Sequence, residues 1–247
     1  DDATMAAFAR WTNLSETTFL LPPTAAGADY RVRIFTPARE LPFAGHPTLG
    51  SAWAWLAAGG QPREAGVVVQ QCGVGLVPIR RDGGRLAFAA PPRLRSGPLD
   101  AGLLQRIESA LGLAPGEVLR HEWVDNGPGW CTVMLASAAR VLALEPDWNA
   151  LGDVKLGVVA PQPAGSDTAF EVRAFVPSLA VPEDPVTGSL NASLAQWLIG
   201  AGLAPASYVA AQGAALGRAG RVHLRAEGGE IWVGGDVCAC IEGEVEL

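Results

Sequence analysis

The sequence predicts an α/β (α+β) protein of two pseudo-symmetric half-domains, each a mixed β-sheet around one central helix. The first observation is an internal repeat, since the segments 32–37 (VRIFTP) and 172–177 (VRAFVP) match in Val, Arg, Phe and Pro. A Pro-x-x-Gly-Ser sequence follows each copy, within 46–51 (HPTLGS) and 184–189 (DPVTGS). The second observation is the content of 30 glycines and 19 prolines, which favours short strands and many turns.

Apolar spacing and turn residues predict the individual elements. Residues 1–12 have apolar side chains at helical spacing and are expected to be the end of a helix. The repeated prolines predict central helices at 47–58 and 185–199. In the first half, strands are expected at 13–21, 30–36, 66–71, 74–80 and 85–90, with a turn at 82–84. In the second half, a helix is expected at 101–111 and strands at 130–135, 154–160, 170–176, 221–226, 230–233 and 237–241.

A Pro- and Gly-rich stretch at 91–98 is the expected linker between the halves. It predicts half-domains at 1–96 and 97–247, with the last strand a candidate to return to the first half. The uncharged stretch 191–217 contains glycine, proline and glutamine, so a helix, a turn and a strand are expected there instead of a membrane span.

Charge and cysteine content restrict the class of partner. The net charge is −7 and lysine and arginine are scattered, which argues against nucleic acid. The cysteines at 72, 131, 238 and 240 show no spacing typical of zinc and are expected to be buried free thiols in a reducing cytosol. The chain opens without a signal-peptide pattern, so a cytoplasmic protein without a metal is expected.

Two ionisable residues stand where the central helices are expected to start. Because proline favours the first helical position, His46 and Asp184 are expected to be the helix N-caps. The free N–H groups of the first turn, with the helix dipole, form a site for a substrate carboxylate. Aspartate is a favoured N-cap without any function, which is the alternative for Asp184. Histidine is an indifferent cap, and a neutral imidazole there could donate a hydrogen bond or relay a proton.

Glu16 is the third candidate, in the segment 13–19 (NLSETTF). It is either a solvated carboxylate at the start of a strand or, because the strand turns apolar at once, a carboxyl at the edge of the core that acts as acid and base. The chain has no Gly-x-Ser-x-Gly sequence and no glycine-rich loop followed by Lys-Ser/Thr, so neither a serine hydrolase nor a nucleotide site is supported.

The segments that carry these candidates resemble the phenazine-biosynthesis isomerase (PhzF-like) family, which has the diaminopimelate-epimerase-like fold. The resemblance rests on NLSETTF (13–19), RIFTPARELPFAGHPTLGSA (33–52), EDPVTGS (183–189), QG…GRAGRV (212–222) and VGGDV (233–237). It implies two halves, each a sheet curled round a helix, with the active site between them, and a homodimer that needs no cofactor.

The resemblance also implies roles for individual residues. It assigns proton transfer to Glu16 and substrate contacts to His46 and Asp184, and it makes these three the catalytic residues. The substrate-binding residues it implies are Gly45 and Ser189, and the neighbouring Ser15 and Gly188 are expected to bind substrate as well.

The chain departs from the family pattern at three places, one of which is Trp11, where the family often has an acidic residue. A first strand with a Gly-Asn-Pro turn, about 25 to 30 residues, is expected before residue 1 and is absent from the sequence. Asp184-Pro185 follows the form of the broad family, in which phenazine synthesis itself is not implied.

These observations predict an isomerase or epimerase that moves a proton next to the carboxylate of a small amino-acid-like or cyclic acid. The alternative from another class is a non-catalytic carboxylate-binding or regulatory protein on the same fold. A hydrolase or lyase that uses His46 as its base is a weaker alternative, because no nucleophile stands at a useful spacing.

Overall fold

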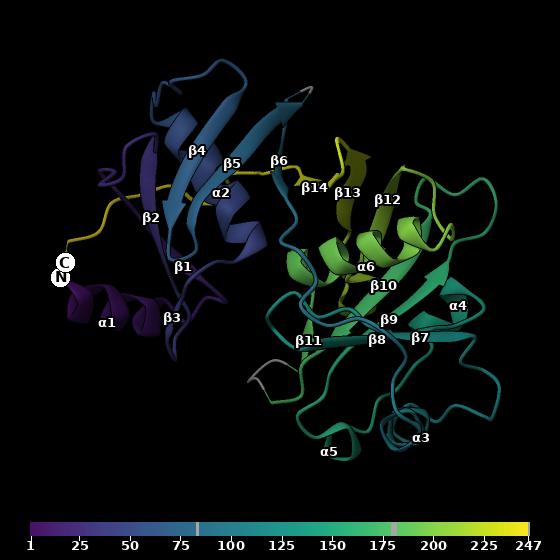
Figure 1. Ribbon diagram of the computed structural model, residues 1–247. Helices are drawn as coiled ribbons and strands as arrows, with labels where there is room; N and C mark the ends of the chain where they lie inside the picture. The colour runs from purple at the N-terminus through teal and green to yellow at the C-terminus, as the bar shows by residue number, and fades with distance from the viewer. Residues whose placement is uncertain (83, 179–181, 247) are drawn as a thin grey trace. The chain divides into compact units, whose positions relative to one another are not determined.

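The computed structural model describes residues 1–82, 84–178 and 182–246. The chain divides into two compact units (Figure 1). Unit 1 comprises Asp1–Ala89 and Gly234–Leu247, and unit 2 comprises Ala90–Val233. The sequence placed the boundary seven residues later, between 96 and 97, and the structure counts the C-terminal segment with unit 1.

Unit 1 is a mixed sheet with α2 as its central helix. Its elements are α1 (Asp2–Thr12), β1 (Thr17–Leu21), β2 (Tyr30–Phe35), β3 (Glu40–Leu41), α2 (Gly45–Ala57), β4 (Val67–Cys72), β5 (Gly75–Asp82) and β6 (Arg85–Ala89). The strand order is β1-β2-β4-β5-β6, and β3 pairs with β2. Strands β2 and β4 are parallel, so α2 is the crossover helix between them, and it packs against β1, β2, β4 and β6.

Unit 2 repeats this plan with α6 as its central helix. Its first elements are α3 (Ala101–Ala110), β7 (Arg120–Trp123), β8 (Trp130–Met134), α4 (Ala138–Leu142), α5 (Trp148–Leu151), β9 (Lys155–Pro161) and β10 (Phe170–Phe175). Its later elements are β11 (Glu183–Asp184), α6 (Gly188–Gly200), β12 (Ser207–Gln212), η1 (Ala214–Leu216), β13 (Gly220–Glu227) and β14 (Glu230–Gly235). The strand order is β14-β13-β12-β10-β9-β8-β7, and β11 pairs with β10. Strands β10 and β12 are parallel, and α6 is the crossover helix between them.

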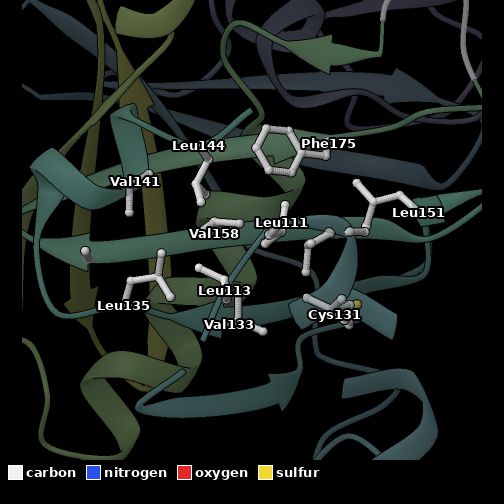
Figure 2. Close-up of a cluster of buried hydrophobic side chains, with 14 of the residues drawn as sticks. Leu111, Leu113, Cys131, Val133, Leu135, Val141, Leu144, Leu151, Val158 and Phe175 are labelled. Carbon is white, nitrogen blue, oxygen red and sulfur yellow. The ribbon is translucent and has the colours of Figure 1, made fainter. Parts of the chain in front are cut away.

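The sheet of unit 2 is covered on both faces, and every residue of β10 is buried. On one face, fifteen buried residues of α3, α4, α5, the strands β8, β9 and β10 and their adjoining loops form a hydrophobic cluster, most of which is drawn in Figure 2. On the other face, α6 packs so closely that a Cβ on Gly157 would lie 2.6 Å from Cδ1 of Leu190. Glycine at this position therefore permits the contact between α6 and β9.

Both central helices begin at positions other than those predicted. α2 begins at Gly45, two residues before Pro47, and its N-cap is Ala44. α6 begins at Gly188, three residues after Pro185, and its N-cap is Thr187. The prediction that His46 and Asp184 are N-caps is therefore wrong: His46 is the second helical residue of α2, and Asp184 ends strand β11.

The predicted register of the internal repeat is also wrong, and strand pairing gives the reason. Phe35 pairs with Glu40 across β2 and β3, and Phe175 pairs with Glu183 across β10 and β11. In both units the helix begins five residues after this glutamate, so Gly45 corresponds to Gly188.

In the corrected register His46 corresponds to Ser189, and Asp184 corresponds to Leu41. A second duplicated contact supports it. A Cβ on Gly73 would lie 2.7 Å from Cα of Pro42, and one on Gly213 would lie 2.6 Å from the carbonyl oxygen of Pro185. The repeated motif is thus Glu-x-Pro-x-x-Gly, at 40–45 and 183–188.

The predicted strand at 237–241 does not form, since residues 236–246 have no regular structure. A strand needs a hydrogen-bonded neighbour, and Ile241 is 95% exposed. The expectation of four buried thiols is wrong for the same segment: Cys131 is buried and Cys72 partly buried, whereas Cys238 and Cys240 are exposed. The predicted turn at 82–84 includes Gly83, which lies outside the described residues.

Among the described helices, none has the length and apolar character that crossing a membrane would require.

Candidate active site

Glu16 and His46 meet in unit 1. Oε2 of Glu16 lies 3.0 Å from Nε2 of His46, and the two side chains are 18% and 54% exposed. Oε2 is itself buried, and within the described parts of the chain it accepts no hydrogen bond of good geometry. The two groups are thus at ion-pair distance, and lone pairs of the oxygen remain available.

The approach to β1 positions Glu16. Helix α1 ends at Asn13, whose left-handed conformation (φ 52°) turns the chain and whose N–H donates to the Ala9 carbonyl. The hydroxyls of Thr12 and Thr17 lie 3.1 Å apart and join the end of the helix to the start of the strand. Glu16 is thus held directly before Thr17, the first residue of β1.

The first turn of α2 positions His46. Gly45 and Pro47 on either side of it are buried, while the imidazole is exposed. Below this turn, Gln70 Nε2 donates to the buried Thr48 hydroxyl (3.0 Å), and the Tyr30 hydroxyl donates to Gln70 Oε1 (2.8 Å). This buried chain fixes the start of α2 against β2 and β4, and with it the position of His46.

Asp184 is held in unit 2 by its neighbour in β11. Glu183 accepts two hydrogen bonds from the guanidinium of Arg173, at 2.9 and 2.7 Å, and both side chains are buried. Arg173 also donates to the carbonyl oxygens of Val141 and Leu144. The bidentate pair fixes β11 on β10, so that Asp184 pairs with Ala174 of the adjacent strand.

Gln212 joins the segment 184–191 to the end of β12. Its Nε2 donates to the Asp184 carbonyl (2.9 Å) and to the Thr187 hydroxyl (3.0 Å), and its Oε1 accepts from the Asn191 side chain (2.7 Å). Thr187 in turn donates its hydroxyl to Oδ2 of Asp184 at 2.6 Å. Gln212 is buried, and no sequence motif identified it, although it stands in the quoted QG…GRAGRV segment.

Ser189 is the second residue of α6, and two side chains from the segment 126–130, which leads into β8, hold it. Trp130 Nε1 donates to Ser189 Oγ (3.0 Å), and Asn126 Nδ2 donates to the Ser189 carbonyl (3.0 Å). Gly188 and Ser189 are partly buried, whereas Ser15 is exposed in unit 1. Sequence reasoning missed both Trp130 and Asn126, because nothing near them in the chain marks a site.

The predicted residues thus fall into two local groups. Ser15, Glu16, Gly45 and His46 belong to unit 1, and Asp184, Gly188 and Ser189 belong to unit 2. Within the described residues, no three His, Cys, Asp or Glu side chains are grouped as metal ligands would be.

The family model described as "Phenazine biosynthesis-like protein" matches residues 1–242 of this chain. Trans-2,3-dihydro-3-hydroxyanthranilate isomerase of Pseudomonas aeruginosa is 38% identical over 256 residues, which cover 98% of this chain and 88% of the relative. A protein of Schizosaccharomyces pombe named antisense-enhancing sequence 1 is 34% identical over 260 residues, covering 97% and 87%.

A crystal structure of a phenazine biosynthesis protein of the PhzF family, from Enterococcus faecalis, superposes with a TM-score of 0.77. The two chains are 25% identical, and the match covers 95% of this chain and 84% of the other. The predicted fold of two half-domains, each a mixed sheet around one central helix, is confirmed.

Proposed function

This chain is a member of the phenazine biosynthesis-like (PhzC–PhzF) family and an isomerase, and on that premise we propose that Glu16 moves a proton on a small cyclic or amino-acid-like carboxylic acid. Glu16 removes a proton from one carbon of the substrate and returns it to another. The transfer is a net isomerisation, so it needs no electron acceptor and, in this proposal, no cofactor.

The contact between Glu16 and His46 is the observation that carries the proposal. Oε2 of Glu16 is buried and accepts no hydrogen bond within the described residues, so its lone pairs are available to a proton of the substrate. His46, at 3.0 Å, limits the orientations of the carboxylate and faces solvent on its other side. It can therefore orient Glu16 and donate a hydrogen bond to the charge that develops on the substrate.

The first turn of α2 and the first turn of α6 are each proposed as an anion-binding turn for a substrate carboxylate. Their early N–H groups have no partner within the helix, and the helix dipole favours an anion there. Gly45 and Gly188 stand first in these helices, so these two positions add no side chain of their own over the N–H groups. Asp184 is proposed to accept a hydrogen bond from an amino or hydroxyl group of the substrate.

The substrate proposed for a first trial is trans-2,3-dihydro-3-hydroxyanthranilate, which the name of the Pseudomonas aeruginosa relative specifies. We also propose, from the family resemblance, that the protein is a homodimer and lies in the cytoplasm. Equilibrium sedimentation of the purified chain would test whether it is a dimer.

The central test compares the wild type with Glu16→Gln in deuterated water. Loss of general acid–base catalysis should lower turnover about 10²- to 10⁴-fold, and the wild type should incorporate solvent deuterium into the product. Glu64→Gln, which changes an exposed carboxylate of the same unit, is the matched control and should retain full activity. An unimpaired Glu16→Gln enzyme, or binding without any conversion by the wild type, would refute the proposal.

A further inference from the structure

Ser189 stands in the first turn of α6, where backbone N–H groups are available as donors. A neighbouring side chain determines whether the Ser189 hydroxyl donates or accepts. A serine hydroxyl has one proton to donate and can accept through its oxygen. The indole N–H of Trp130 is a donor only, so in the 3.0 Å contact between them Ser189 Oγ must be the acceptor. Among the described residues, no acceptor takes the remaining proton of Ser189 Oγ.

The loop that leads into Trp130 is held by several hydrogen bonds. Asp125 Oδ1 accepts from the N–H groups of Gly127 (2.8 Å) and Gly129 (2.6 Å), which closes the loop into a tight turn. The Asp125 carbonyl accepts from Leu94 N–H at 2.6 Å, and Trp130 begins strand β8. The indole ring is buried at 3% exposure, so its N–H has a fixed direction.

Asn126 in the same loop holds the backbone of Ser189. Its Nδ2 donates to the Ser189 carbonyl, which also accepts from the Ser193 hydroxyl at 3.1 Å. The main chain of Ser189 and its side-chain oxygen are therefore both held from the loop 125–130. The hydroxyl proton is the part of this residue that remains available.

We propose that Trp130 is a positioning residue for substrate recognition: by donating to Ser189 Oγ, it directs the Ser189 hydroxyl proton toward a carboxylate oxygen of the substrate. The inference rests on the proposed function, since it assumes a carboxylate at the first turn of α6. It adds a specificity role for a residue that need not touch the substrate. A donor oriented in advance binds an anion without losing rotational freedom on binding.

The test measures binding of two ligands by isothermal titration calorimetry. One is 3-hydroxyanthranilate, the aromatic counterpart of trans-2,3-dihydro-3-hydroxyanthranilate, which carries the same three substituents and cannot undergo the isomerisation. The other is 2-aminophenol, which is the same molecule without the carboxylate. The ratio of the two dissociation constants reports how strongly the protein recognises the carboxylate.

Ser189→Ala removes the donor and should weaken 3-hydroxyanthranilate binding about tenfold or more, as for a hydrogen bond to a charged group. Trp130→Phe keeps an aromatic ring but removes the N–H, and should weaken it about three- to tenfold. Neither change should alter the binding of 2-aminophenol. In the Ser189→Ala background, Trp130→Phe should have no further effect, because the indole acts through the serine.

The possible outcomes separate this inference from the proposed function. If the wild type binds both ligands equally or binds neither, the carboxylate site fails, and the inference fails with it. If Ser189→Ala loses carboxylate recognition while Trp130→Phe retains it, the positioning role alone is refuted. Equal weakening of both ligands in Trp130→Phe would mean a packing defect and would also refute it.

A second replacement keeps the test valid if the phenylalanine variant does not fold. Incorporating 3-benzothienylalanine at position 130 replaces the indole N–H with sulfur in a ring of nearly the same shape. This variant should keep the wild-type melting temperature and still lose carboxylate recognition. Wild-type recognition in a folded benzothienyl variant would overturn the proposal.

Discussion

Replacing Arg173 with methionine should destabilise the protein several times more than the same replacement at Arg33. The two arginines occupy equivalent positions of the duplicated hairpin, and each pairs with a glutamate through both of its carboxylate oxygens. Each also lies over a phenylalanine ring two residues on, with the guanidinium carbon 4.9 Å from the ring of Phe175 and 5.1 Å from that of Phe35. The lost stacking energy is therefore similar in the two variants.

The difference lies in the solvent exposure of the partners. The side chain of Glu183 is 5% exposed, whereas that of Glu40 is 42% exposed. Removing one member of a buried ion pair leaves an uncompensated charge and costs about 3 to 5 kcal/mol. Arg173→Met also deprives the Val141 and Leu144 carbonyls of a donor. The exposed pair with Glu40 is worth only about 0.2 to 1 kcal/mol, and the second partner of Arg33, Asp2, is 83% exposed. Arg33→Met should therefore cost far less than Arg173→Met beyond the shared packing loss.

Urea unfolding followed by circular dichroism would measure the two free energies, and hydrogen exchange of the β10 amides would locate the effect in unit 2. The double variant Arg173→Met/Glu183→Leu should recover part of the loss, because it removes the buried charge that the single change leaves behind. A cost for Arg173→Met no larger than that for Arg33→Met would refute the reasoning, since burial would then have no role.

Three further predictions concern glycines and cysteines. Gly213→Ala should lower the free energy of unfolding by about 2 kcal/mol or more, because φ is +94° and the new Cβ would lie 2.6 Å from the Pro185 carbonyl oxygen. Gly217→Ala, at φ +68° in open space, should lower it by only about 1 kcal/mol. Equal melting temperatures for the two variants would contradict this. Burial raises the pKa of Cys131 to about 12. The thiolate forms more readily in the unfolded chain, so above about pH 8.5 the free energy of unfolding should fall by up to about 1.4 kcal/mol per pH unit. Cys131→Ala should flatten that decline, as measured by urea unfolding up to about pH 10. At pH 8 a thiol reagent should modify the exposed Cys238 at once and Cys131 only after unfolding.

The sequence predicted the elements of this fold well where the apolar periodicity and the turn-forming glycines and prolines agree. The strands at Tyr30–Phe35 and Phe170–Phe175 were placed to within one residue, because their alternation is uninterrupted. The two-residue strands at 40–41 and 183–184 were not predicted, since so short a segment carries no periodicity. The arginine–glutamate pairs that hold them depend on tertiary contacts that no local pattern reports.

The candidate site was predicted in part for the same reasons. Glu16 and His46 were named from motifs, and the structure brings them together across 30 residues of chain. The error about Asp184 arose because the repeat was aligned on Pro47 and Pro185, whose short spacing to glycine and serine matches by coincidence. The Glu-x-Pro-x-x-Gly spacing at 40–45 and 183–188 is equally visible in the sequence and gives the register that the structure has. Trp130 and Gln212 could not be identified, because their role depends on which helix they face.

The corrected register changes what the duplication means for function. The features that recur in both units are structural. They are an arginine–glutamate pair beneath the hairpin and a glycine packed on the proline that precedes each helix. The positions proposed to carry the chemistry do not recur, because histidine in one unit corresponds to Ser189 in the other, and Asp184 corresponds to a leucine. Two equal proton-transfer sites would need the same titratable group twice. The two units therefore fit different tasks, with proton transfer proposed for the Glu16–His46 pair and recognition of the substrate proposed for the turn that begins α6.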